Sequence, residues 1–116
     1  MYLGRIVEVA PRDALYGARR HPYTVSLLAA VPRPDPARER ARTRVRPIGE
    51  IGSAAALPTG CRFHPRCPRA RAVAARGGDT VEAAGTRLPT ACVRDDPALA
   101  SVGTVGHLAA CHFPDE

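Results

Sequence analysis

Four cysteines are the residues of this chain whose type and spacing best fit a chemical role. Five, 24 and 18 residues separate successive members of the set, which is Cys61, Cys67, Cys92 and Cys111. Thiolates bind soft and borderline metals, and four of them complete a closed metal site. The alternative interpretation is four small buried apolar side chains, because free cysteine is among the most buried residue types. The number of thiols and their confinement to the second half of the chain favour the metal site.

The stretch GCRFHPRCP, residues 60–68, bears on the kind of metal. Structural zinc sites place paired ligands about two to four residues apart, so the five-residue gap fits zinc poorly. An iron–sulfur cluster is wider than one ion and tolerates looser spacing, and Cys67-Pro68 matches the Cys-Pro ending of ferredoxin motifs. Three arginines around the first two thiols would offset the negative charge of such a cluster: Arg62, Arg66 and Arg69. Zinc stays open as the second choice.

Three histidines and the redox state of the thiols also bear on this site. His64, His107 and His112 are candidate substitute ligands, but four thiols already fill a site, so we expect these rings at the surface or behind the ligands. The chain shows no signal peptide, and the reducing compartment that this implies disfavours disulfides. The sequence contains no glycine-rich phosphate loop, and its carboxylates form no pair suited to acid–base catalysis. We therefore expect no enzymatic activity.

The charge pattern suggests a partner only weakly. The formal net charge is +6, and all 17 basic residues are arginine. Such a balance permits nucleic acid or an anionic membrane as partner, but no aromatic residues interleave the arginines to stack on bases. Alternate arginines from Arg38 to Arg46 would share one side of an extended chain. The longest apolar run, residues 26–31, is too short to span a bilayer.

The elements that must position the thiols indicate a small, irregular α+β fold. We expect a β-hairpin over residues 1–10 that turns at Gly4-Arg5, then a helical turn near residues 11–15. Thr24 is the expected N-cap of a helix over residues 25–31 that Pro32 ends, with Leu27, Leu28 and Val31 on one face. After a Pro- and Arg-rich linker we expect a short helix over residues 70–76, a surface excursion over residues 79–91 and a strand over residues 107–112. The predicted domains are residues 1–32, the linker 33–60 and a cysteine-rich metal-binding lobe 61–116.

Several stretches together resemble a known family. They are YLGRIVE at residues 2–8, RHPYT at 20–24, LLAAVP at 27–32, PTGCRFHPRCP at 58–68 and HLAACH at 107–112. This set is similar to the C-terminal region of the ATP-binding subunits of oligopeptide, dipeptide and nickel ABC importers. The resemblance implies a [4Fe–4S] cluster on Cys61, Cys67, Cys92 and Cys111. It also implies a paired ATPase subunit and transmembrane permease subunits as partners, and a place at the cytoplasmic face of the membrane.

The family's ATPase core carries a phosphate loop, a signature motif, a catalytic glutamate and a switch histidine, and these motifs are absent from this sequence. We therefore expect a truncated product, a remnant or a mis-assigned start, and no ATP hydrolysis; ATP belongs to the full-length family. The alternative hypothesis, from another class, is a free-standing four-cysteine metal protein whose Arg38–Arg46 stripe contacts nucleic acid.

Overall fold

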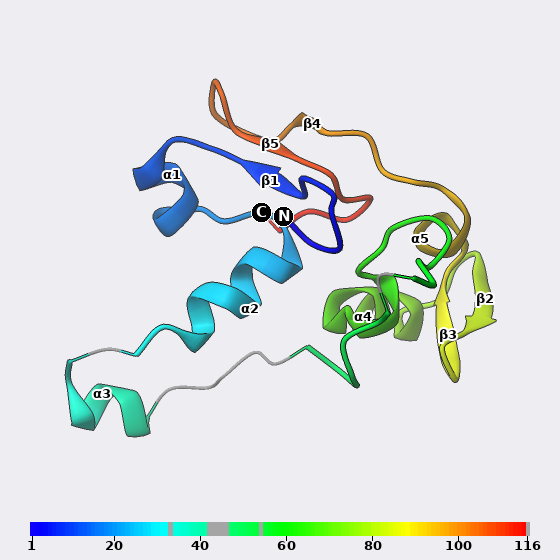
Figure 1. Cartoon of the computed structure of the whole chain (residues 1–116), viewed down its shortest axis with the longest axis horizontal. Coiled ribbons are helices and arrows are strands. Elements are labelled where there is room, and N and C mark those ends of the chain that lie inside the picture. Colours follow the sequence, from blue (N-terminus) through cyan, green and yellow to red (C-terminus); the bar gives the residue numbers. More distant parts are fainter. Residues whose placement is uncertain (33, 42–46, 54, 116) are drawn as a thin grey trace.

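The computed structural model describes residues 1–32, 34–41, 47–53 and 55–115. Its short helices are α1 (Arg12–Gly17), α2 (Pro22–Ala30), α3 (Pro36–Arg40), α4 (Pro68–Ala75) and α5 (Thr90–Arg94), with a 3-10 turn, η1, at His64–Arg66. The strands are β1 (Glu8–Val9), β2 (Thr80–Ala83), β3 (Thr86–Pro89), β4 (Ala100–Ser101) and β5 (Leu108–Ala109). The expected small α+β fold is confirmed. Figure 1 shows α3 at the edge of the molecule, beyond α2 and away from the strands.

Two separate sheets organise the strands. The first has the order β1-β5-β4, with Glu8 opposite Ala109 and Ala100 also opposite Ala109. The last strand is therefore the central one, and its expected position near residues 107–112 is confirmed. The second sheet is the hairpin β2-β3, against which α4 packs.

The β-hairpin expected over residues 1–10 is reduced to one isolated bridge between Tyr2 and Arg5, because β1 pairs with β5 instead, and the turn differs from the expected one. Tyr2 and Arg5 exchange backbone hydrogen bonds of 2.8 and 2.9 Å, so Leu3 and Gly4 are the two turn residues. Both have positive φ, 43° and 76°, which is the geometry of a type I′ turn. The expectation of a turn at Gly4-Arg5 was wrong because glycine takes the second position, where the positive φ is larger, and not the first.

The start of α2 is also displaced from the expected residue. His21 is the N-cap, its Nδ1 accepts the Tyr23 N–H at 3.1 Å, and Pro22 occupies the first helical position. The expected cap Thr24 lies inside the helix. The expected apolar face is wrong too, since Leu27 and Val31 are 49% and 52% exposed, and α2 buries Pro22 and Ser26 instead.

The segment over residues 79–91 is part of the core and not a surface excursion. It forms β2, β3 and the start of α5, and Ala84-Gly85 turn the hairpin with φ of 48° and 71°. Leu88 of β3 is completely buried. The helix expected over residues 70–76 is confirmed as α4, and Gly77 and Gly78 follow it with positive φ.

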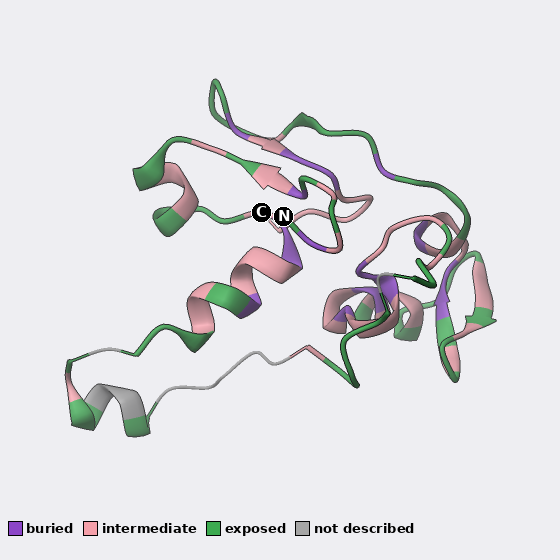
Figure 2. Ribbon diagram, in the orientation of Figure 1, coloured by how far each residue is buried: buried purple, intermediate pink, exposed green. Residues whose placement is uncertain are grey.

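The hydrophobic core gathers around two of the cysteines. Its buried members are Tyr2, Val7, Phe63, Cys67, Ala70, Leu88 and Cys92. Figure 2 shows buried positions in α4, β3, α5 and the chain that leads into α4, and also at the start of α2 and along β5, whereas the described part of α3 is mainly exposed. Arg38 and Arg40 lie in α3 and not in extended chain, and Arg42, Arg44 and Arg46 lie outside the described residues. The core is therefore built at the thiols and not at the arginine stripe.

Candidate metal centre

All four cysteines line one cavity. Cys61 and Cys67 flank η1, Cys92 is in α5, and Cys111 follows β5. The four thiols are free, and the cavity between the surrounding side chains has a volume of about 10 Å³. That volume is close to the minimum for one water molecule, so the thiols already face one another across a small space. The fold brings together residues that 50 positions of chain separate, whereas their role as ligands stays a prediction.

Backbone contacts fix the first cysteine against the third. The Cys61 N–H donates to the Cys92 carbonyl at 3.0 Å. Gly60 allows this approach, because its φ is +60° and a Cβ there would lie 2.6 Å from the Val93 carbonyl oxygen. The Cys61 carbonyl accepts the His64 N–H at 2.9 Å and lies 2.9 Å from its Nδ1. Backbone contacts thus hold the Gly60-Cys61 segment against α5, although the two are distant in the chain.

Cys67 occupies the N-cap of α4, and its sulfur accepts the Ala70 N–H at 3.3 Å. A helix N-terminus carries partial positive charge, and a thiolate there is stabilised by it. Pro68 follows at the first helical position, where its missing N–H costs nothing. The Cys-Pro pair that the sequence offered as a ferredoxin-like ending therefore also has a local structural reason.

Burial keeps the thiols protonated when no metal is bound. It raises the pKa of Cys61 and Cys67, and it raises the pKa of Cys92 and Cys111 to about 12. The neighbouring thiols raise the pKa of Cys92 further, since two thiolates in one cavity repel each other. A metal that binds here must displace these protons, so its affinity rises with pH.

Of the three arginines expected to offset the cluster charge, one acts on the thiols. The Arg69 guanidinium lines the cavity and lowers the pKa of Cys67 and Cys111, although burial outweighs it. It also bonds the Asp115 carboxylate and the Pro114 carbonyl, the latter at 3.0 Å. Arg62 donates to the Leu3 carbonyl and Arg66 to the Gly49 carbonyl, so these two tie down distant backbone segments. The expectation that all three arginines serve the charge of the site was too broad.

The donor geometry separates two kinds of metal group. A single zinc ion holds its ligands at about 2.3 Å, which brings four sulfurs within about 4 Å of one another. Within the described ranges, no three His, Cys, Asp or Glu side chains are placed to hold one ion in this way. The set of four thiols fits a four-thiolate group in its chemistry, but it is not preset for a single ion.

The three histidines named from the sequence have other partners, although His64 and His112 also line the thiol cavity. His64 bonds the Cys61 carbonyl, and the His112 Nε2 lies 2.9 Å from the Asp95 carbonyl oxygen. The His107 Nε2 lies 2.6 Å from Glu8 Oε1, and both side chains are 1% exposed. His64 and His107 are buried, so neither ring lies at the surface. His64 lines the thiol cavity behind Cys61, which is the other position expected for these rings.

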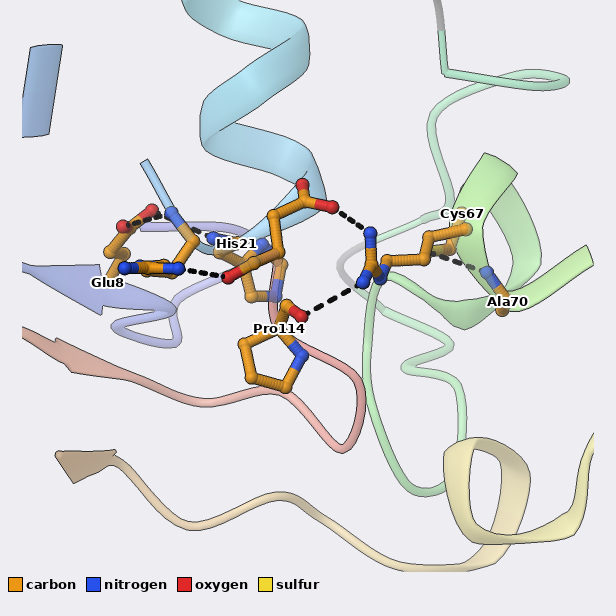
Figure 3. Close-up of polar contacts among 8 residues, drawn as sticks. Glu8, His21, Cys67, Ala70 and Pro114 are labelled. Atoms are coloured by element: carbon orange, nitrogen blue, oxygen red, sulfur yellow. Dashed lines mark hydrogen bonds and ion pairs between the residues drawn. The ribbon is translucent and has the colours of Figure 1, made fainter. Parts of the chain in front are cut away.

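A buried carboxylate that the sequence analysis passed over joins β1 to the start of α2. Glu8 accepts the Arg20 N–H at 2.7 Å and the His21 N–H at 3.1 Å (Figure 3). It does so in addition to its contact with His107. Burial raises the pKa of Glu8, but hydrogen bonds from Thr24, His107 and the two backbone amides outweigh burial and lower it. The His-Pro-Tyr segment is held in place by this carboxylate.

His21 is the site residue that sequence reasoning missed. Its side chain is 1% exposed and lines the thiol cavity. Burial lowers the pKa of His21 to about 4, so the ring is neutral at pH 7. The RHPYT stretch was the available signal for this residue. It indicated a family resemblance and a helix start, but not a buried ring at the thiol cavity.

Comparisons with known proteins identify the family. Residues 7–73, more than half of the chain, match the C-terminal region of oligopeptide/dipeptide transporters. The chain belongs to this family. The resemblance drawn from RHPYT and PTGCRFHPRCP is thereby confirmed. Within this transporter C-terminal region lie Cys61 and Cys67, while Cys92 and Cys111 fall beyond the matched residues.

Two relatives of the transporter C-terminal region show its scale. A probable peptide ABC transporter ATP-binding protein of Sinorhizobium fredii is 60% identical over 70 residues, covering 60% of this chain and 19% of that protein. The oligopeptide transport ATP-binding protein of Escherichia coli is 39% identical over 97 residues, covering 84% of this chain and 29% of that protein. The chain thus spans 19% and 29% of the length of these two relatives. Over the described residues, no helix is long and apolar enough to cross a membrane.

Proposed function

We propose that this chain is the C-terminal region of an ATP-binding subunit for peptide import, and that its four thiols hold a [4Fe–4S] cluster as a structural cross-link. The convergence of Cys61, Cys67, Cys92 and Cys111 on one cavity carries the proposal. The paired ATPase subunit and the permease subunits of an importer are the partners, at the cytoplasmic face of the membrane. The chain itself does not hydrolyse ATP, and a chain-dependent ATPase rate would contradict this.

The chain's own residues would hold the group from three sides. Cys61 and Cys67 approach from η1 and α4, Cys92 from α5, and Cys111 from the end of β5. When bound, the group supplies four iron–sulfur bonds and a one-electron couple. Arg69 and the N-terminus of α4 offset the thiolate charge, while Phe63, which is 1% exposed, keeps water from one wall. Because the ligands belong to separate segments, the bound group stabilises the fold by mass action.

The test is anaerobic reconstitution of the chain with iron and sulfide, followed by iron and sulfide analysis and Mössbauer spectroscopy. We expect four irons per chain, and each of four single Cys→Ser variants should lose the cluster. Ser26→Ala is the matched control, because Ser26 is 5% exposed but does not line the cavity. Zinc bound without iron, or cluster loading unchanged in two or more Cys→Ser variants, would refute the proposal.

A further inference from the structure

The His21 ring presents an unsatisfied hydrogen-bond donor beside the four thiols. Its Nε2 is buried and has no hydrogen-bond partner of normal geometry. The Ala110 backbone lies close enough to the ring to raise its pKa slightly, but burial outweighs this effect. Buried donors are rarely left unpaired, and each such case calls for an explanation. The ring lines the cavity that the four cysteines also line. A group bound in this cavity would lie within reach of the ring.

The proton on this ring is placed by the start of α2. Nδ1 accepts the Tyr23 N–H at 3.1 Å, so it carries no proton and the neutral ring is protonated on Nε2. The ring cannot easily turn, because Glu8 holds the His21 backbone N–H at 3.1 Å and the Phe63 ring packs at 5.9 Å between centroids. Figure 3 shows His21 between Glu8 on one side and Pro114 and Cys67 on the other. The donor is therefore pre-oriented, with Nδ1 toward the helix and Nε2 at the opposite edge of the ring.

One sulfur already accepts a backbone donor, since the Ala70 N–H lies 3.3 Å from the Cys67 sulfur. Hydrogen bonds to the sulfurs are one of the levers that set the potential of an iron–sulfur cluster. A ring N–H at the apolar wall of the cavity acts strongly, because little water competes with it.

We propose that the Nε2–H of His21 donates a hydrogen bond to a sulfur of the cluster held by the four thiols, and that this bond raises the cluster's reduction potential. The inference rests on the proposed function. The bond stabilises the reduced state more, because that state carries one additional negative charge. His21 is thus a positioning and tuning residue and not a ligand.

Two substitutions separate this donor from the capping role of the same ring. The amide nitrogen of glutamine reaches the position of Nε2, so His21→Gln keeps a donor at the cavity. The amide of asparagine overlays Nδ1, so His21→Asn keeps an N-cap acceptor for Tyr23 and removes the donor. Both variants and the unmodified chain are reconstituted anaerobically, and their potentials are measured by redox titration followed by EPR.

We expect His21→Asn to favour the oxidised state about tenfold more than the unmodified chain does, a shift of about −59 mV for one electron. His21→Gln should stay near the unmodified value. In the reduced cluster, ¹⁵N-histidine labelling should give one hyperfine coupling by ENDOR that His21→Asn abolishes. Equal potentials and an unchanged ¹⁵N coupling in all three proteins would overturn the inference while leaving the cluster intact. Failure of the unmodified chain to bind iron would overturn the proposed function as well.

Discussion

Replacing Gly60 by alanine should destabilise the chain by about 3 kcal/mol. The backbone there has φ of +60°, which costs a non-glycine residue about 1–2 kcal/mol. The new methyl group would also lie 2.6 and 2.7 Å from the carbonyl oxygens of Val93 and Cys92. These are backbone atoms that cannot rotate away, so the 3.0 Å hydrogen bond from Cys61 to Cys92 must lengthen or break, at about 1–1.5 kcal/mol more.

Urea unfolding of the metal-free chain measures this loss, and Gly85→Ala is its matched control. Gly85 has a similar φ of +71°, but a Cβ there meets nothing within 4 Å, so its loss should be about 1.5 kcal/mol. Reconstitution gives a second readout, since Gly60→Ala separates two thiols and should lower iron loading, whereas Gly85→Ala should not. Equal losses of unfolding free energy in the two variants would refute the contact argument.

Three further changes probe the rest of the molecule. In the metal-free chain, the folded-state pKa of His21 is about 4 and the unfolded value is 6.5, so the unfolded state binds the proton first as pH drops. The free energy of unfolding should therefore fall by about 3 kcal/mol between pH 7 and pH 4, as measured by urea titrations at the two pH values. A flat profile would contradict this. Glu8→Gln should cost about 2–4 kcal/mol because it leaves His107 and two amides facing a neutral group, while Glu82→Gln on the exposed side of β2 should change little. Leu88→Ala should cost about 2–5 kcal/mol in thermal unfolding, against almost nothing for Val105→Ala, since Leu88 is 0% and Val105 97% exposed.

Local signals in the sequence were sufficient for part of this structure. Gly77-Gly78 marked the end of α4, the apolar run near residue 108 marked β5, and the RHPYT and PTGCRFHPRCP stretches marked the family. The cysteines could be named as a set because thiol chemistry does not depend on the fold. Apart from the first turn, which lies one residue earlier than expected, the elements that failed are those that depend on tertiary contacts.

The role of His21 shows why the remainder was out of reach. A histidine before proline is an uncommon N-cap, and it was passed over because Thr24 is the stronger capping residue by propensity. The choice is settled by Glu8, which holds the His21 backbone and the Thr24 hydroxyl, and that contact joins different elements. Leu88 was missed in the same way, because its burial depends on α4 packing over a hairpin whose Ala84-Gly85 turn is a weak local signal.

The position of β5 at the centre of its sheet has a consequence for synthesis. β1 and β4 both pair with β5, although it is the last strand along the chain. The sheet therefore cannot close until the segment from His107 to Cys111 has left the ribosome. The same segment supplies the partner of the buried carboxylate and the fourth thiol. A stop codon or frameshift just before residue 107 would remove all three together, so the proposed four-thiol site could form only after nearly all of this sequence has been translated.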